Sequence, residues 1–109
     1  MKRRGKVFCK GRLAGELGET EEGKFVFSYN QGYLVQPSVR PVSLTLPLRE
    51  EPYTADRLFP FFYGLLAEGV LKEFQCRDLK IDETDAFGRL LKTAGGETIG
   101  DVTVTEDVP

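Results

Sequence analysis

Few side chains in this sequence could carry out chemistry. Histidine is absent, so a Ser–His or Cys–His nucleophile pair cannot form. Carboxylates, lysines, tyrosines and the two cysteines, Cys9 and Cys76, remain as candidates for acid–base catalysis. The cysteines form no C-x-x-C pair, and we interpret them as reduced, partly buried thiols. The sequence therefore predicts no catalytic residue, no metal site and no cofactor, and we expect the protein not to be an enzyme.

The glycines do not form a phosphate-binding motif. None of the 12 belongs to a G-x-x-x-x-G-K-[ST] loop or to a strand–G-x-G-x-x-G–helix unit. The glycine-rich run 95–100 follows a predicted helix and precedes a predicted strand. An anion site at a helix N-terminus needs the opposite order. We therefore expect a tight helix-to-strand turn over these residues.

One carboxylate, Glu68, lies in an otherwise apolar helical segment. It could make a polar contact to a partner or to a loop backbone. It could also be an ordinary exposed helix residue beside Lys72, which is four positions further on and can form an ion pair. We favour the second interpretation, because such surface pairs are common and contribute little.

Size and charge limit the possible functions. The chain has 109 residues, which suits one domain over residues 1–109. Its net charge of −2 argues against direct nucleic-acid binding. The basic residues Lys2, Arg3, Arg4, Lys6 and Lys10 are balanced by nearby glutamates, and we interpret them as a solvated N-terminus and strand face. No apolar run could span a membrane or form a signal peptide, so we expect a cytoplasmic protein.

The N-terminal half has the pattern of a β-sheet. Residues 5–10, 13–17 and 24–29 alternate in polarity and are separated by turn residues, which predicts an antiparallel meander. Residues 42–46 alternate in the same way and predict a half-buried strand. A loop is predicted over residues 49–56. A final strand is predicted to begin near Ile99.

Two helices are predicted in the C-terminal half. The first covers residues 58–73, and Gly69 is expected to mark a kink or a break into a short helix through Phe74. The second begins after Asp82, which can cap it, while Asp85 suits the helix dipole. Its apolar stripe consists of Phe87, Leu90, Leu91 and Ala94. Together the elements predict an α+β fold, with an antiparallel β-sheet or small partly open barrel of about five strands packed with two main helices.

Several short motifs in a fixed order carry a family resemblance. These are FFYGLLAEG at 61–69, DAFGRLL at 85–91 and GGETIGDVTV at 95–104, preceded by VFC at 7–9, LAGEL at 13–17 and FVFSY at 25–29. In this order they resemble the N-terminal subdomain of the HipA family. Members of that family are serine/threonine kinases that act as bacterial toxins.

The resemblance implies an interaction subunit. In ordinary HipA-like proteins the subdomain is fused to the kinase, whereas nothing follows Pro109 in this sequence. The chain is therefore similar to HipS, the separate small antitoxin subunit of HipBST-type toxin–antitoxin systems. Such a subunit would bind and neutralise a HipT-like serine/threonine kinase toxin, in a complex with a HipB-like helix-turn-helix DNA-binding protein. The kinase signatures, such as an H-R-D-like loop, are absent, so no catalytic residue carries over.

Two other functions remain open. The chain could be an accessory subunit needed for the assembly or activity of a split HipA-like kinase, with no inhibitory role. It could also be a small ligand- or nucleic-acid-binding β-domain with an aromatic stacking face, formed by Phe25, Phe27, Tyr29 and Tyr33. At period-2 spacing these aromatic residues are more typical of a core.

The predicted partner-binding surface surrounds Gly69. It consists of Tyr63, Leu66, Glu68, Gly69, Val70, Leu71 and Phe74. A helix broken by glycine can protrude and present apolar side chains with a polar rim. The alternative interpretation places all of these apolar residues in the core.

Overall fold

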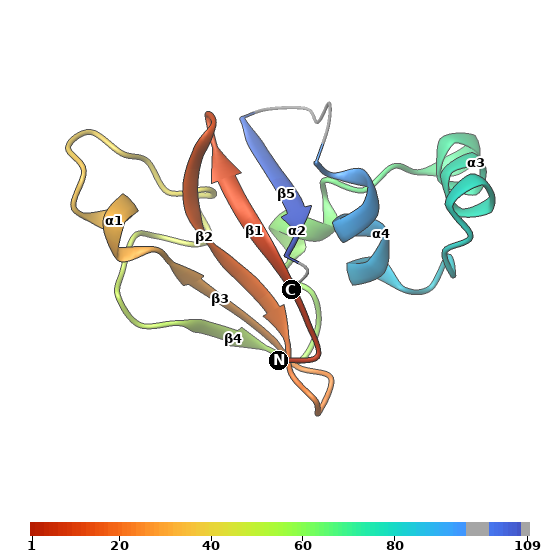
Figure 1. The fold of residues 1–109 in the computed structure, drawn as a ribbon, viewed down its shortest axis with the longest axis horizontal. Coiled ribbons are helices and arrows are strands. Elements are labelled where there is room, and N and C mark those ends of the chain that lie inside the picture. Colours follow the sequence, from red (N-terminus) through yellow and green to blue (C-terminus); the bar gives the residue numbers. More distant parts are fainter. Residues whose placement is uncertain (96–100, 108–109) are drawn as a thin grey trace.

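An open antiparallel sheet forms the centre of the computed structural model, which describes residues 1–95 and 101–107. Strands β1 (Arg3–Cys9), β2 (Arg12–Glu19) and β3 (Phe25–Tyr29) form the predicted meander. The short strand β4 (Tyr53–Ala55) pairs with β3, and β5 (Val102–Glu106) pairs with β1. The resulting order is β4-β3-β2-β1-β5 (Figure 1). The predicted α+β fold with five strands is confirmed, in its sheet form rather than as a barrel.

The sheet forms because apolar and polar residues alternate along its strands. Val7, Leu17, Phe27 and Val104 are fully buried on the face that the core covers. The β1–β2 turn at Lys10 and Gly11 has positive φ angles of 51° and 80°, which match the twist of a tight hairpin.

The segment 42–46 is not the predicted strand. Only an isolated bridge joins Ser43 and Leu46, and Leu44 is 93% exposed. The Tyr29 hydroxyl instead accepts a hydrogen bond from the Val42 amide at 3.0 Å and donates one to the Leu46 carbonyl. Burial raises the pKa of Tyr29 to about 12, so the hydroxyl stays protonated. A tyrosine hydroxyl therefore satisfies backbone groups that a neighbouring strand would otherwise satisfy.

The segment predicted as the first helix, residues 58–73, is divided between two helices. The first of them, α2 (Pro60–Tyr63), ends at Gly64. A separate short helix, α1 (Gln31–Leu34), lies earlier in the chain and follows β3. Glu68 is extended and interrupts the helical segment, and the chain becomes helical again in α3 (Gly69–Leu79). The break at Gly69 is confirmed, but the helix before it ends early and the helix after it runs beyond Phe74.

The last helix, α4 (Ala86–Thr93), carries the predicted apolar stripe into the core. Its cap differs from the prediction: the Asp85 carboxylate accepts the Gly88 amide at 3.1 Å. Asp82 instead accepts the Thr84 amide at 2.9 Å, within the preceding turn. Of the predicted turn over 95–100, residues 96–100, with Ile99, lie outside the described residues.

Among the basic residues predicted to be solvated, Lys2, Arg4, Lys6 and Lys10 are exposed, and only Arg3 departs from the prediction. Its guanidinium donates to Glu19 at 2.7 and 3.1 Å, and to Asp85 at 2.8 and 3.0 Å. It also lies 5.3 Å from the centre of the Phe87 ring. This one side chain therefore links β1, β2 and the N-terminus of α4. The hydrogen bonds from Arg3 hold the pKa of Asp85 below its usual range.

Candidate partner-binding site

Helix α3 packs little against the rest of the domain for its length. Figure 1 shows it at one end of the molecule, beyond α4 and away from the sheet. Among its 11 residues only Cys76 is buried. By contrast, α4 buries five consecutive residues, Phe87 to Leu91. Most of the surface of α3 is therefore free to contact another molecule.

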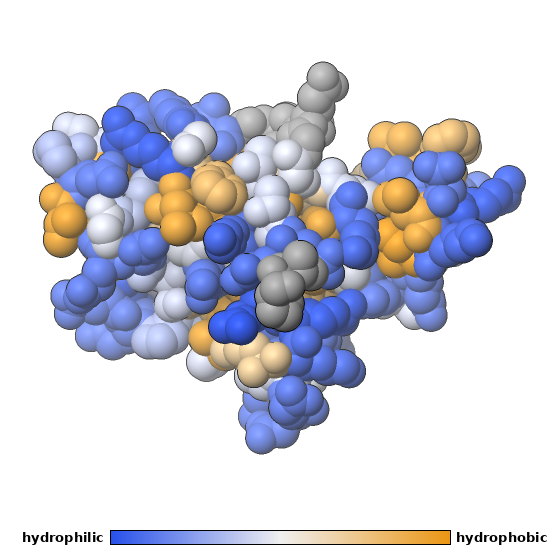
Figure 2. Space-filling model, viewed as in Figure 1, coloured by the Kyte–Doolittle hydropathy of each residue, from blue (hydrophilic) through white to orange (hydrophobic). Residues whose placement is uncertain are grey.

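Three apolar side chains of α3 are exposed on neighbouring positions. Val70, Leu71 and Phe74 are 80%, 56% and 66% exposed. Residues three and four apart lie on the same face of a helix, so Phe74 is next to both of the others. We call these three residues the α3 surface. Figure 2 shows apolar side chains gathered at this end of the molecule, with hydrophilic ones around them.

The other predicted site residues divide into exposed and buried ones. Tyr63, at the end of α2, is 53% exposed, whereas Leu66 is 8% exposed and belongs to the core. Glu68 is exposed and precedes α3. The predicted exposure of Glu68 is thus confirmed, but Glu68 stands just before the helix, and within the described residues no ion pair joins it to Lys72. The apolar residues of the prediction are therefore not all core.

Gly69 supplies the change of direction at the start of α3. Its φ of +63° lies in the left-handed region, which glycine adopts without steric cost. A Cβ at this position would meet no atom within 4 Å. Backbone conformation, rather than lack of space, is therefore the reason for glycine here.

The base of α3 is held by a buried arginine that the sequence analysis missed. Arg89 of α4 is 4% exposed and donates from Nη2 to the Ala67 carbonyl oxygen at 2.6 Å. A cavity of about 250 Å³ lies beside this contact, lined in part by Tyr63, Glu68 and Lys72. The only feature of the sequence that indicates this role is the charge of Arg89, which stands within α4 among uncharged residues that are buried.

Replacing Arg89 with methionine should therefore loosen α3. The change keeps much of the side-chain volume and removes a hydrogen bond from a charged donor, so we expect a loss of about 2 kcal/mol in the free energy of unfolding. Amides of residues 69–79 should also exchange faster with deuterium. The control is Lys92→Met, which removes an exposed cation of the same helix. Equal effects of both variants, or unchanged exchange in α3, would contradict this role.

Comparison with known proteins decides the family. The model of the HipA N-terminal domain family matches residues 5–105. The chain belongs to this family. A solved structure of the N-terminal domain of HipA toxin is similar, with a TM-score of 0.72 and 37% identity, over 99% of this chain and 95% of the other. The resemblance inferred from the sequence motifs is thus confirmed.

Two relatives place this HipA N-terminal domain in different contexts. An uncharacterized protein of Haemophilus influenzae is 40% identical over 105 residues, which cover 96% of this chain and 93% of the relative. A Sinorhizobium fredii protein named "Putative kinase Y4mE" is 31% identical over 94 residues, covering 86% of this chain. This chain corresponds to only 22% of that kinase. The similarity is to the N-terminal domain of HipA and not to its catalytic kinase part.

Within residues 1–95 and 101–107, no helix has the length and apolar character needed to cross a membrane.

Proposed function

We propose that this protein is a non-catalytic antitoxin subunit, which binds a HipT-like serine/threonine kinase toxin and neutralises it in the cytoplasm. The observation that carries the proposal is the α3 surface. A HipA N-terminal domain that leaves three neighbouring large apolar side chains of one helix more than half exposed needs a partner to cover them. We favour a kinase as this partner, because the same domain makes up about a fifth of a longer relative that is named as a putative kinase.

The surroundings of α3 suit a protein interface. Interfaces typically have an apolar centre and a polar rim. The exposed residues Glu73 and Arg77 supply such a rim beside Val70, Leu71 and Phe74. Tyr63 extends the same region onto α2, and tyrosine is one of the residues that most often dominate binding energy. Burial of the three apolar side chains would contribute on the order of several kcal/mol at about 25 cal/mol per Å².

The proposed complex includes a third component. A HipB-like helix-turn-helix protein would supply DNA binding, because this chain has a net charge of −2. The chain itself would take part in DNA binding only through its contacts with this partner.

Co-expression with a cognate kinase tests the proposal. An antitoxin should restore growth to cells that express the kinase, and purified protein should bind the kinase and suppress phosphorylation of its substrate. If the kinase becomes more toxic or more active in the presence of this chain, the protein is an accessory subunit needed for assembly, and the antitoxin proposal is wrong. Lack of any binding would exclude both functions.

A further inference from the structure

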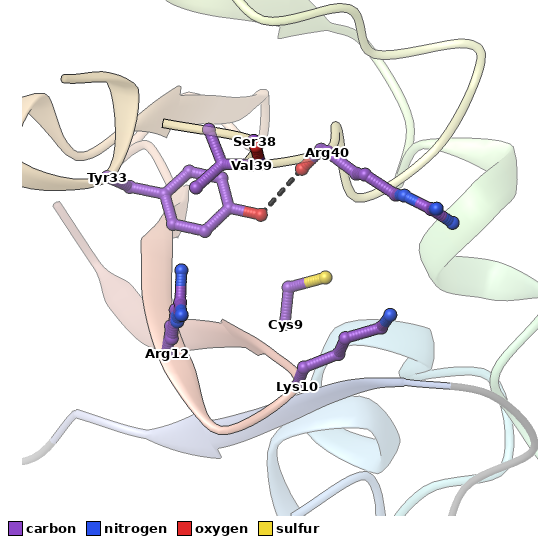
Figure 3. A pocket seen from close by; sticks show the side chains of 7 residues that line it. All are labelled: Cys9, Lys10, Arg12, Tyr33, Ser38, Val39 and Arg40. Atoms are coloured by element: carbon purple, nitrogen blue, oxygen red, sulfur yellow. Dashed lines mark hydrogen bonds between the residues drawn. The ribbon is translucent and has the colours of Figure 1, made fainter. Parts of the chain in front are cut away.

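A hollow lined by basic residues lies away from α3, where the β1–β2 turn meets the loop that follows α1. Its volume is about 230 Å³. Lys10, Arg12 and Arg40 provide three cationic side chains around it, and Cys9, Tyr33 and Val39 complete most of its wall. Figure 3 shows the Cys9 thiol between Arg12 on one side and Lys10 and Arg40 on the other.

Within the described part of the chain, the positive charges of this hollow are only partly compensated. No aspartate or glutamate lines it among the residues that the structure describes. Arg12 donates to the neutral Gln36 amide oxygen at 3.1 Å. Lys10 Nζ forms a long ion pair with Asp101 Oδ2 at 4.0 Å, and Asp101 lines the adjoining hollow. Three cations around one hollow are therefore notable in a chain whose net charge is −2.

The backbone segments that carry these cations are held in place. Lys10 occupies the tight β1–β2 turn, and Arg12 is the first residue of β2. The Tyr33 hydroxyl donates to the Arg40 carbonyl oxygen at 2.5 Å, so the loop bearing Arg40 is tied to α1 (Figure 3). The backbone around the hollow is thus set before any ligand arrives, which reduces the entropy lost on binding.

We propose that this hollow binds a tetrahedral oxyanion of the phosphate class. Guanidinium groups match phosphate oxygens with two parallel hydrogen bonds, and lysine adds a point charge. Since a water molecule takes roughly 30 Å³ in the liquid, the hollow has room for such an ion with several waters. The site is separate from the α3 surface, so this inference does not depend on the proposed function.

Titration with inorganic phosphate, followed by amide chemical shifts at constant ionic strength, tests the site. We expect saturable shifts confined to residues 9–12, 33 and 38–40, with a Kd near or below about 1 mM. Arg12→Gln and Arg40→Gln should each weaken binding by about tenfold or more, because each removes a charge-assisted contact.

Lys24→Gln is the matched control, since it removes one positive charge at the far end of β3, beside Asp56. It should leave phosphate binding unchanged. Non-saturable shifts, or equal losses in the control and in the two arginine variants, would overturn the proposal, because binding would then reflect only overall charge.

Phosphoserine and free phosphate distinguish two sources of the same chemistry. Markedly tighter binding of phosphoserine supports a phosphorylated side chain as the ligand, whereas similar affinities support the free ion. Cys9 offers a second readout, because it lines the hollow while Cys76 lies in α3. Bound phosphate should slow alkylation of Cys9 and not of Cys76. Unchanged alkylation of Cys9 at saturating phosphate would contradict binding in this hollow.

Discussion

Val70→Asp, Leu71→Asp and Phe74→Asp should each keep the melting temperature of the wild type and weaken binding to the kinase by about 30-fold or more, or about 2 kcal/mol. All three side chains are more than half exposed, so a carboxylate at these positions remains solvated in the free domain. In the complex the same carboxylate would be buried against an apolar partner surface without compensation. Calorimetry with the purified kinase measures the affinity, and rescue of growth should fail in parallel.

The matched control for these variants is Leu44→Asp. Leu44 is 93% exposed and lies in the 42–46 segment, so the same apolar-to-acidic change is made away from α3. It should bind the kinase as tightly as the wild type does. If the three α3 variants unfold the domain, these residues have a structural role and the site is wrong. If they fold and still protect cells, the contact lies elsewhere, with the sheet face or the loop over residues 35–41 that follows α1 as the next candidates.

Arg3→Met should lower the free energy of unfolding at neutral pH by about 2 kcal/mol. The change removes the guanidinium that donates a hydrogen bond to the Glu19 carboxylate at 2.7 Å. Glu19 is only 8% exposed and would be left without this partner. It also removes both contacts to Asp85, the cap of α4. Urea unfolding measures the loss. Arg4→Met is the control, because Arg4 is the exposed neighbour on the same strand and should have little effect.

The contribution of Asp85 should depend on pH. Arg3 lowers the pKa of Asp85 in the folded protein, so the stabilisation is complete above the ordinary value of about 3.9 and is lost as the pH falls through the lowered folded value. Asparagine is also a good N-cap, so Asp85→Asn removes mainly the charge. The wild type should therefore be more stable than Asp85→Asn from about pH 5 to 7, and the difference should shrink below about pH 4. A difference that is constant down to about pH 2 would contradict the ion pair as its cause.

Local sequence patterns predicted the elements whose partners are close in the chain. The meander β1–β2–β3 follows from alternating residues and tight turns, because a hairpin needs only neighbouring segments. The stripe on α4 was also predicted, since helical spacing alone determines which residues share a face. The same short motifs, in order, sufficed to indicate the HipA N-terminal domain family.

Contacts between distant segments were decided by the tertiary structure. Strand β4 has only three residues, too few for a periodic signal, and it exists because β3 offers a free edge. The 42–46 segment alternates like a strand, yet its Val42 amide and Leu46 carbonyl form hydrogen bonds with the Tyr29 hydroxyl and not with a neighbouring strand. Arg3 and Asp85 are 82 positions apart, and nothing local marks them as partners.

The candidate site shows the same division. Sequence by itself determined that the chain breaks at Gly69 and that apolar residues follow the break. It left open whether those residues are core or surface, because an apolar side chain is compatible with either until the packing of its helix is known. The tertiary structure places Leu66 inside and Val70, Leu71 and Phe74 outside. The physical reason is that α2, α4 and the sheet already fill the core, so α3, tied at its base by Arg89, has no apolar face of the domain left to cover.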